Sequence, residues 1–298
     1  MSTPFSCLPA RPRWQQQLRQ VLPLGEGAAP SGPLVMGILN ITPDSFYDGG
    51  AYVRPQRALH HARHLLAAGA DIIDIGGESS RPGAASISES EEFDRVIPTI
   101  EALRNESDTM ISLDTSRSRV MRAGLAAGAD LINDIRAFAQ APDVLTELCQ
   151  RGVPVCVVHM QGEPASMQHD PRYVNVVADV FDFLEERARH CIGQGLSPNK
   201  IVLDPGIGFG KSLAHNLALL HALPALVARG FPVLAGVSRK SMLGTLTGRT
   251  VEQRLHGSVA AALHAAQAGA AIVRVHDVAP TIDALKVWQA IAMQPARH

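Results

Sequence analysis

The segment AAGADIIDIG (67–76) joins the end of a predicted helix to a short apolar strand, and similar segments occur as AAGADLINDI (126–135) and QAGAAIVRVH (267–276). In each copy a glycine stands third, where the helix ends and where a positive φ costs glycine nothing. The apolar run that follows does not alternate with polar residues, which is typical of a parallel strand buried on both faces. The repeated segment therefore indicates parallel strands connected by helices.

Eight apolar runs of this kind follow one another from residue 34, and each is followed by a stretch of helical periodicity. The predicted strands lie at 34–39, 71–76, 110–114, 130–135, 153–160, 200–204, 232–237 and 271–276. The predicted helices lie at 55–68, 88–104, 116–127, 142–151, 173–193, 212–222, 251–268 and 280–292. This order predicts an α/β fold, an eight-stranded (β/α) TIM barrel. An open doubly wound sheet tolerates the same pattern and is the alternative.

Composition and charge exclude several classes of protein. Hydrophobic residues make up 46% of the chain and charged residues 18%, which excludes intrinsic disorder. The net charge of −1 supplies no field for nucleic acid or an anionic membrane. The four cysteines contain no CxxC pair, and no segment has the roughly 20 apolar residues of a membrane-spanning helix. We expect a protein of the reducing cytoplasm that binds neither nucleic acid nor membrane.

No linker divides the predicted barrel, so we expect one catalytic domain over residues 31–298. Residues 1–30 are expected to form a loosely ordered N-terminal extension. The extension has arginines and faintly resembles an organellar transit peptide, but Pro4, Pro9 and Pro12 interrupt any amphipathic helix there.

Polar side chains follow the predicted strands at their C-terminal ends, where a barrel places its active site. They are Asn40; Glu78 with Arg81; Asp114; Asn133 with Asp134; His159; Asp204; Ser238 with Arg239 and Lys240; and Arg274 with His276. Each residue taken alone could cap the next helix, and for Asp114 the local sequence leaves a cap and a site residue equally open. Because every strand ends in this way, we favour an active site at this rim.

Two loops and one charged cluster add to this prediction. The loops at 40–50 and 76–86 are longer than the two to six residues typical of such connections, which indicates active-site lids. Cationic side chains follow the seventh and eighth strands, where barrels commonly bind phosphate. They include Arg239, Lys240 and Arg274 and predict an anionic, phosphorylated substrate.

Three short motifs are rejected. DPGIGFGKS (204–212) has Pro205 where a P-loop requires glycine. GVSRK (236–240) has lysine where a nucleophile elbow has its second glycine, which excludes a serine hydrolase of that type. HHARH (60–64) lacks the glutamate of a zinc-binding helix and is expected to lie on a solvated face.

Together, the loops and the strand ends resemble dihydropteroate synthase, a family of the folate pathway that sulfonamides inhibit. The matching segments are 36–50, 71–84, 111–117, 132–135, 159–168, 203–211, 236–244, 256–263 and 273–278, in family order. The resemblance implies a (β/α) barrel, usually a homodimer, that uses Mg²⁺. It also implies a transferase that condenses 6-hydroxymethyl-7,8-dihydropterin pyrophosphate with 4-aminobenzoate and releases pyrophosphate. Ser80 stands where the family commonly has threonine.

The resemblance further implies a role for each candidate site residue. The pterin would contact Asp114, Asn133, Ile135, Met160, Asp204, Gly236 and Lys240. The pyrophosphate would contact Asn40, Arg274 and His276, and Asn40 would also hold Mg²⁺. The 4-aminobenzoate would contact Ser80, Arg81, Pro82, Phe209 and Ser241. Catalysis would depend on Asp48, Arg81 and Lys240, with Asp48 facing the positive charge that develops on the pterin.

Two other functions remain open. A methyltransferase barrel that binds methyltetrahydrofolate would share the Asp and Asn residues but would not need SRKS (238–241) or RVH (274–276). A pterin-binding homologue without activity would be expected to lose Arg81, Lys240 or Asp48, and this chain retains all three. Phe209 could also be a core aromatic, although its glycine-flanked loop predicts few apolar neighbours.

Overall fold

The computed structural model describes residues 32–41, 53–79, 86–164 and 166–293. Within them, eight parallel strands form one sheet in the order β6-β5-β4-β3-β2-β1-β8-β7. The strands are β1 (Leu34–Asn40), β2 (Ile72–Gly76), β3 (Met110–Asp114), β4 (Leu131–Asp134), β5 (Val155–Val158), β6 (Ile201–Asp204), β7 (Leu234–Ala235) and β8 (Ile272–Val275). Each predicted strand contains or overlaps one of them.

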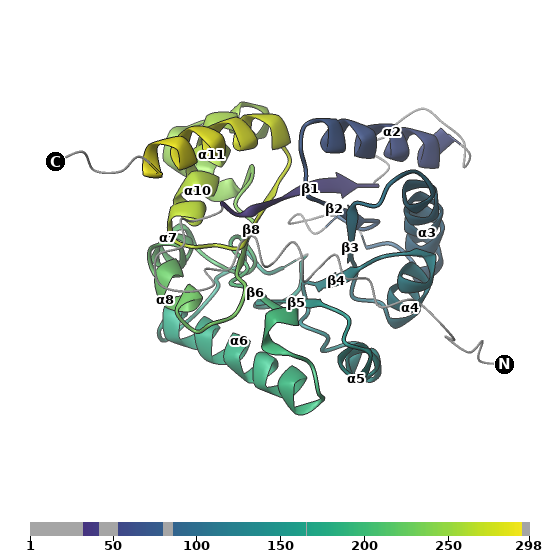
Figure 1. The fold of residues 1–298 in the computed structure, drawn as a ribbon. Coiled ribbons are helices and arrows are strands. Elements are labelled where there is room, and N and C mark those ends of the chain that lie inside the picture. Colours follow the sequence, from purple (N-terminus) through teal and green to yellow (C-terminus); the bar gives the residue numbers. More distant parts are fainter. Residues whose placement is uncertain (1–31, 42–52, 80–85, 165, 294–298) are drawn as a thin grey trace.

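The sheet closes on itself where β6 meets β7. A parallel bridge joins Leu203 to Val233, and the Leu203 N–H donates to the Pro232 carbonyl at 2.9 Å. Figure 1 shows the helices arranged around the outside of the strands. The fold is therefore a nearly closed TIM barrel, and the open doubly wound alternative is wrong because its edge strands would not meet.

Helices connect the strands along the described chain. They are α2 (Val53–Ala67), α3 (Glu89–Glu106), α4 (Ser118–Ala127), α5 (Pro142–Arg151), α6 (Val176–Gly193), α7 (Leu213–His221), α8 (Leu223–Val227), α9 (Ser241–Thr247), α10 (Leu255–Gln267) and α11 (Val278–Ala292), with short 3₁₀ turns at Pro198–Lys200 and Val251–Gln253. The sequence did not predict α8 or α9. The helix predicted from 173 begins later because Asn175 caps α6, accepting from the Val177 and Ala178 N–H groups.

The repeated glycine turns have the predicted conformation. Gly69, Gly128 and Gly269 have φ of 97°, 121° and 91°. The positive φ favours glycine at Gly69, and a Cβ there would also require Ile282 Cδ1, 2.7 Å away, to move. The HHARH segment lies on α2 with its three histidines exposed, which confirms the solvated face.

Two hydrophobic clusters divide the core. The larger cluster packs the outer face of the strands against the surrounding helices. The smaller cluster fills the barrel interior and includes Met36, Ile72 and Met110, which share one register level on β1, β2 and β3. This apolar layer leaves the polar side chains that follow it at the C-terminal mouth. Among the described residues, none of the helices has the length and apolar character needed to cross a membrane.

Candidate active site

The C-terminal ends of four neighbouring strands bring three predicted site residues and one glycine to the same level of the barrel. Asn40, Gly76, Asp114 and Asn133 pair in sequence along β1, β2, β3 and β4. Gly76 has no side chain to fill the space between them: a Cβ there would lie 3.7 Å from both Asn40 Oδ1 and Asp114 Oδ2. The level therefore brings the oxygen acceptors of Asn40 and Asp114 to either side of Gly76.

Arg274 extends from β8 across the barrel interior to two carboxylates. Its Nε donates to Asp74 Oδ2 at 2.6 Å, and its Nη2 donates to Asp114 Oδ2 at 2.9 Å. Asp74, in the middle of β2, has no exposed surface. Asp74 is not among the predicted site residues, although an aspartate within the apolar run IIDIG is a signal in itself, because a buried carboxylate needs a partner.

Two aspartates at the mouth, Asp114 and Asp204, lie in surroundings that disfavour a charged carboxylate. Burial, and then the charge of Asp74, raises the pKa of Asp114 to about 7, while Arg274 opposes the rise. Burial also raises the pKa of Asp204, at the end of β6, although its Oδ1 accepts from the Gly206 N–H at 2.7 Å. Both groups therefore gain from a ligand that donates hydrogen bonds to them.

The structure shows whether Asp114 caps the next helix, the alternative that the sequence left open. Helix α4 begins at Ser118, and Asp114 points instead to Arg274. It is Asp134 that supports a turn, since its carboxylate accepts from the Arg136 and Phe138 N–H groups at 2.9 and 2.7 Å. The cap interpretation of Asp114 is therefore wrong.

Lys240 and Phe209 lie in contact at the mouth. The Lys240 Nζ is 4.0 Å from the centroid of the Phe209 ring, a cation–π distance. Phe209 is only 8% exposed and belongs to the inner cluster, against which Ile135 and Met160 pack. The expectation that it has few apolar neighbours is wrong. Burial, and then the charge of Arg274, lowers the pKa of Lys240 to about 8.

The other residues of the phosphate cluster differ in availability. The Arg239 guanidinium is bound to Asp277 by two hydrogen bonds of 2.9 and 2.7 Å, so its charge is already paired. His276 has its Nδ1 3.0 Å from Ser238 Oγ. Ser241 is exposed at the first turn of α9. The predicted cluster thus contains two arginines that are already paired, Arg239 with Asp277 and Arg274 with Asp74 and Asp114.

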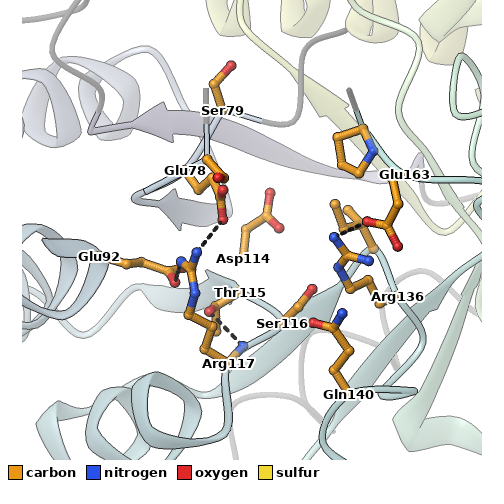
Figure 2. A pocket seen from close by; sticks show the side chains of 13 residues that line it. Glu78, Ser79, Glu92, Asp114, Thr115, Ser116, Arg117, Arg136, Gln140 and Glu163 are labelled. Atoms are coloured by element: carbon orange, nitrogen blue, oxygen red, sulfur yellow. Dashed lines mark hydrogen bonds and ion pairs between the residues drawn. The ribbon is translucent and has the colours of Figure 1, made fainter. Parts of the chain in front are cut away.

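A cavity of about 390 Å³ opens beside Asp114 (Figure 2). Its charged walls are largely paired: Arg136 bonds Glu163 at 2.5 Å, and Arg117 lies 3.1 Å from Glu78 and also bonds Glu92. The lining residues are Glu78, Ser79, Ser86, Glu92, Asp114, Thr115, Ser116, Arg117, Ile135, Arg136, Gln140, Glu163 and Pro164. Because Asp114 and Ile135 are among them, the cavity continues the polar mouth of the barrel.

Four predicted site residues lie outside the described residues: Asp48, Ser80, Arg81 and Pro82. The central parts of both predicted lid loops and the N-terminal extension do so as well. Their assignments stay predictions. Gly236, by contrast, is placed at the mouth, where a Cβ would lie 3.8 Å from Asp204 Oδ2.

Comparison with known proteins agrees with this geometry. A family described as pterin binding enzyme matches residues 36–276. The chain is 52% identical over 262 residues to dihydropteroate synthase of Haemophilus influenzae, covering 88% of this chain and 95% of that protein. A structure of Xanthomonas albilineans dihydropteroate synthase with 4-aminobenzoic acid has a TM-score of 0.83 at 50% identity, covering 89% and 94% of the two chains. Another, in complex with 7,8-dihydropteroate, has a TM-score of 0.80 at 48% identity, covering 89% and 95%.

The barrel and its polar mouth thus define a pterin-binding enzyme, and the chain belongs to that class. Within the class it belongs to the dihydropteroate synthases. These transferases of folate biosynthesis condense 6-hydroxymethyl-7,8-dihydropterin pyrophosphate with 4-aminobenzoate to give 7,8-dihydropteroate and pyrophosphate.

Proposed function

We propose that the mouth of this barrel binds the hydrogen-bonding edge of the pterin through Asp114, Asn133 and Asp204. The observation that carries the proposal is Asn133, which is 3% exposed and whose Oδ1 has no hydrogen-bond partner among the described residues. A buried carbonyl oxygen without a donor is costly, and a pterin supplies amino and amide N–H donors. Two carboxylates and one amide oxygen match that set of donors.

Apolar and small residues complete the proposed pterin site. Ile135 and Met160 pack against the inner cluster and would contact the faces of the ring. Gly236 leaves space beside Asp204. Lys240, between Phe209 and the carboxylates, would face both the pterin and the departing pyrophosphate.

The pyrophosphate would contact Arg274, His276 and Asn40. Asn40 would also hold Mg²⁺, since an amide oxygen is a suitable ligand and this ion usually completes its shell with waters and substrate phosphates. No group of three or more His, Cys, Asp or Glu side chains in the described chain could hold a metal ion. The ion, when bound, would offset negative charge on the pyrophosphate.

The proposed reaction breaks the bond between the pterin methylene carbon and a pyrophosphate oxygen, and the electron pair leaves with the oxygen. Lys240 and Arg274 stabilise the charge that develops there, because they are fixed before the reaction begins. The amine nitrogen of 4-aminobenzoate then forms a bond to the methylene carbon and loses a proton. Asp48 would face the cationic pterin, and Ser80, Arg81, Pro82, Phe209 and Ser241 would orient the 4-aminobenzoate.

An assay of pyrophosphate release tests the proposal. The chain should release pyrophosphate from the pterin substrate in a manner that depends on 4-aminobenzoate, and a sulfonamide should compete with 4-aminobenzoate. Binding of the pterin without turnover would favour the inactive homologue. Methyl transfer from methyltetrahydrofolate without pyrophosphate release would favour the methyltransferase.

A homodimer is proposed from exposed apolar residues on α7, α9 and α11. Leu217 on α7, Leu246 on α9 and Val287 and Ile291 on α11 are 41–69% exposed. A second copy would cover them, so light scattering should give twice the chain mass and Leu246→Glu should reduce it. We also propose a cytoplasmic location, since Cys149, Cys156 and Cys191 are buried free thiols.

A further inference from the structure

Lys211 is a buried lysine that the site assignments leave unused. It lies between β6 and α7 and is 2% exposed. Its Nζ is 2.9 Å from His159 Nδ1, 3.0 Å from the Phe209 carbonyl oxygen and 3.3 Å from the His159 carbonyl oxygen. An ammonium group has three N–H donors, so the three neutral acceptors match it one to one.

The loop that holds Lys211 is pressed closely onto the end of β5. Gly206, Gly208 and Gly210 have φ of 66°, 84° and 63°. A Cβ at Gly206 would lie 1.8 Å from the His159 carbonyl oxygen, so only glycine permits this approach. The loop is also bound from outside, since the Gly208 N–H donates to Asn216 Oδ1 at 2.7 Å.

Phe209 is the loop residue whose side chain reaches the mouth. Its backbone carbonyl accepts from Lys211 Nζ, while its ring lies under Lys240 Nζ. The same ammonium therefore fixes the backbone of the residue that makes the cation–π contact. Without it, two carbonyl oxygens and a ring nitrogen would be buried without a donor, and the loop would be expected to move toward water.

We propose that Lys211 is a positioning residue that sets Phe209 against Lys240 and so shapes the 4-aminobenzoate side of the site. The proposal rests on the proposed role of Phe209. Because Lys211 is 2% exposed, it would act through the Phe209 backbone rather than by contact with a substrate. A lysine that only stabilised the barrel would affect both substrates alike, whereas a residue acting through Phe209 affects 4-aminobenzoate first.

The first test compares Lys211→Met with Lys200→Met. Lys200 donates to the Gly152 carbonyl at 2.7 Å, just before β6, so the control removes a lysine–carbonyl bond at the opposite end of the same strand. For Lys211→Met, KM for 4-aminobenzoate should rise about tenfold, while kcat and KM for the pterin substrate, which a displaced Phe209 affects only through Lys240, should change by a smaller factor. Lys200→Met should leave all three values unchanged.

The second test is a double-mutant cycle with Phe209→Ala. If Lys211 acts through Phe209, Lys211→Met should raise KM for 4-aminobenzoate less than about twofold in the Phe209→Ala background. Lys211→Gln keeps two N–H donors for the two carbonyls, and its KM should lie between those of the wild type and Lys211→Met. This milder variant serves as the test if Lys211→Met does not fold.

If the wild-type enzyme is active, equal losses for both substrates in Lys211→Met, or additive effects in the double-mutant cycle, would overturn the inference. A wild-type chain that shows no release of pyrophosphate dependent on 4-aminobenzoate would instead contradict the proposed function, and the assignment of Lys211 with it.

Discussion

Arg274 Nε lies 2.6 Å from Oδ2 of Asp74, a carboxylate with no exposed surface. A guanidinium inside a barrel needs a counter-charge. Asp74 is fully buried, so its carboxylate stays paired with Arg274 and does not bind ligand or solvent instead. Asp114, the second partner of Arg274, lies at the mouth and can accept from the pterin as well. Asp74 is therefore the fixed partner and Asp114 the shared one.

Substitution of Asp74 tests this division. Asp74→Asn should lower kcat/KM for the pterin substrate by about tenfold or more. Arg274 would then have Asp114 as its one charged partner among the described residues and would compete with the pterin for that carboxylate. Asp71→Asn is the control, since Asp71 accepts from the Val35 N–H at 2.8 Å at the opposite end of β2. Unchanged kinetics in Asp74→Asn would show that the pair has no part in the site.

Lys240→Ala should reduce turnover strongly and leave the fold intact. Removing one preorganised electrostatic group typically costs about 10²–10³ in kcat, and burial already disfavours the charge of Lys240. Circular dichroism should be unchanged. Lys286→Ala, on the exposed side of α11, is the matched control. A kcat/KM close to that of the wild type would remove Lys240 from the mechanism.

Asp204→Asn should weaken pterin binding far more than 4-aminobenzoate binding. The amide replaces a group that only accepts with one that also donates, and a hydrogen bond to a charged group contributes about 1.5–3 kcal/mol. Calorimetry with each ligand measures the difference. Equal losses for both ligands would count against a pterin role for Asp204.

Asp114 predicts a pH dependence of stability. Its pKa is raised from 3.8 to about 7, so the folded chain keeps a proton that the unfolded chain releases, and stability falls as the pH rises between these values. Asp114→Asn should therefore raise Tm more at pH 8 than at pH 5, by a difference of roughly 2–4 °C. Thermal unfolding at the two pH values measures this effect. A larger rise in Tm at pH 5 than at pH 8 would mean that the charge of Arg274 lowers the pKa of Asp114 more than burial raises it.

Much of the fold was predictable because its signals are local. Glycine turns and apolar runs lie within a few residues of one another, and parallel strands in a barrel bring their C-terminal ends together without further information. Closure of the barrel has no local signal, since it depends on a contact between Leu203 and Val233, which are 30 positions apart.

The site residues that sequence missed have distant partners. Arg274 and Asp74 are 200 positions apart, and Lys211 and His159 are 52 apart. Arg239 was counted with the phosphate cluster for the same reason, because Asp277, which pairs with it, lies 38 positions away. Sequence showed which charges lie near the rim, and only the fold showed which of them are already neutralised.

The short strand β7 has a consequence for the motions of the barrel. In the described chain, β7 is joined to β6 by the single bridge between Leu203 and Val233, whereas β2 pairs over five positions on each side. Local opening should therefore begin at this junction, and the Leu203 amide should exchange its proton for deuterium before those of β2. A ligand that contacts Asp204 on one side and Lys240 on the other spans the junction. Such a ligand should slow that exchange, because it would hold the two sides of the junction together.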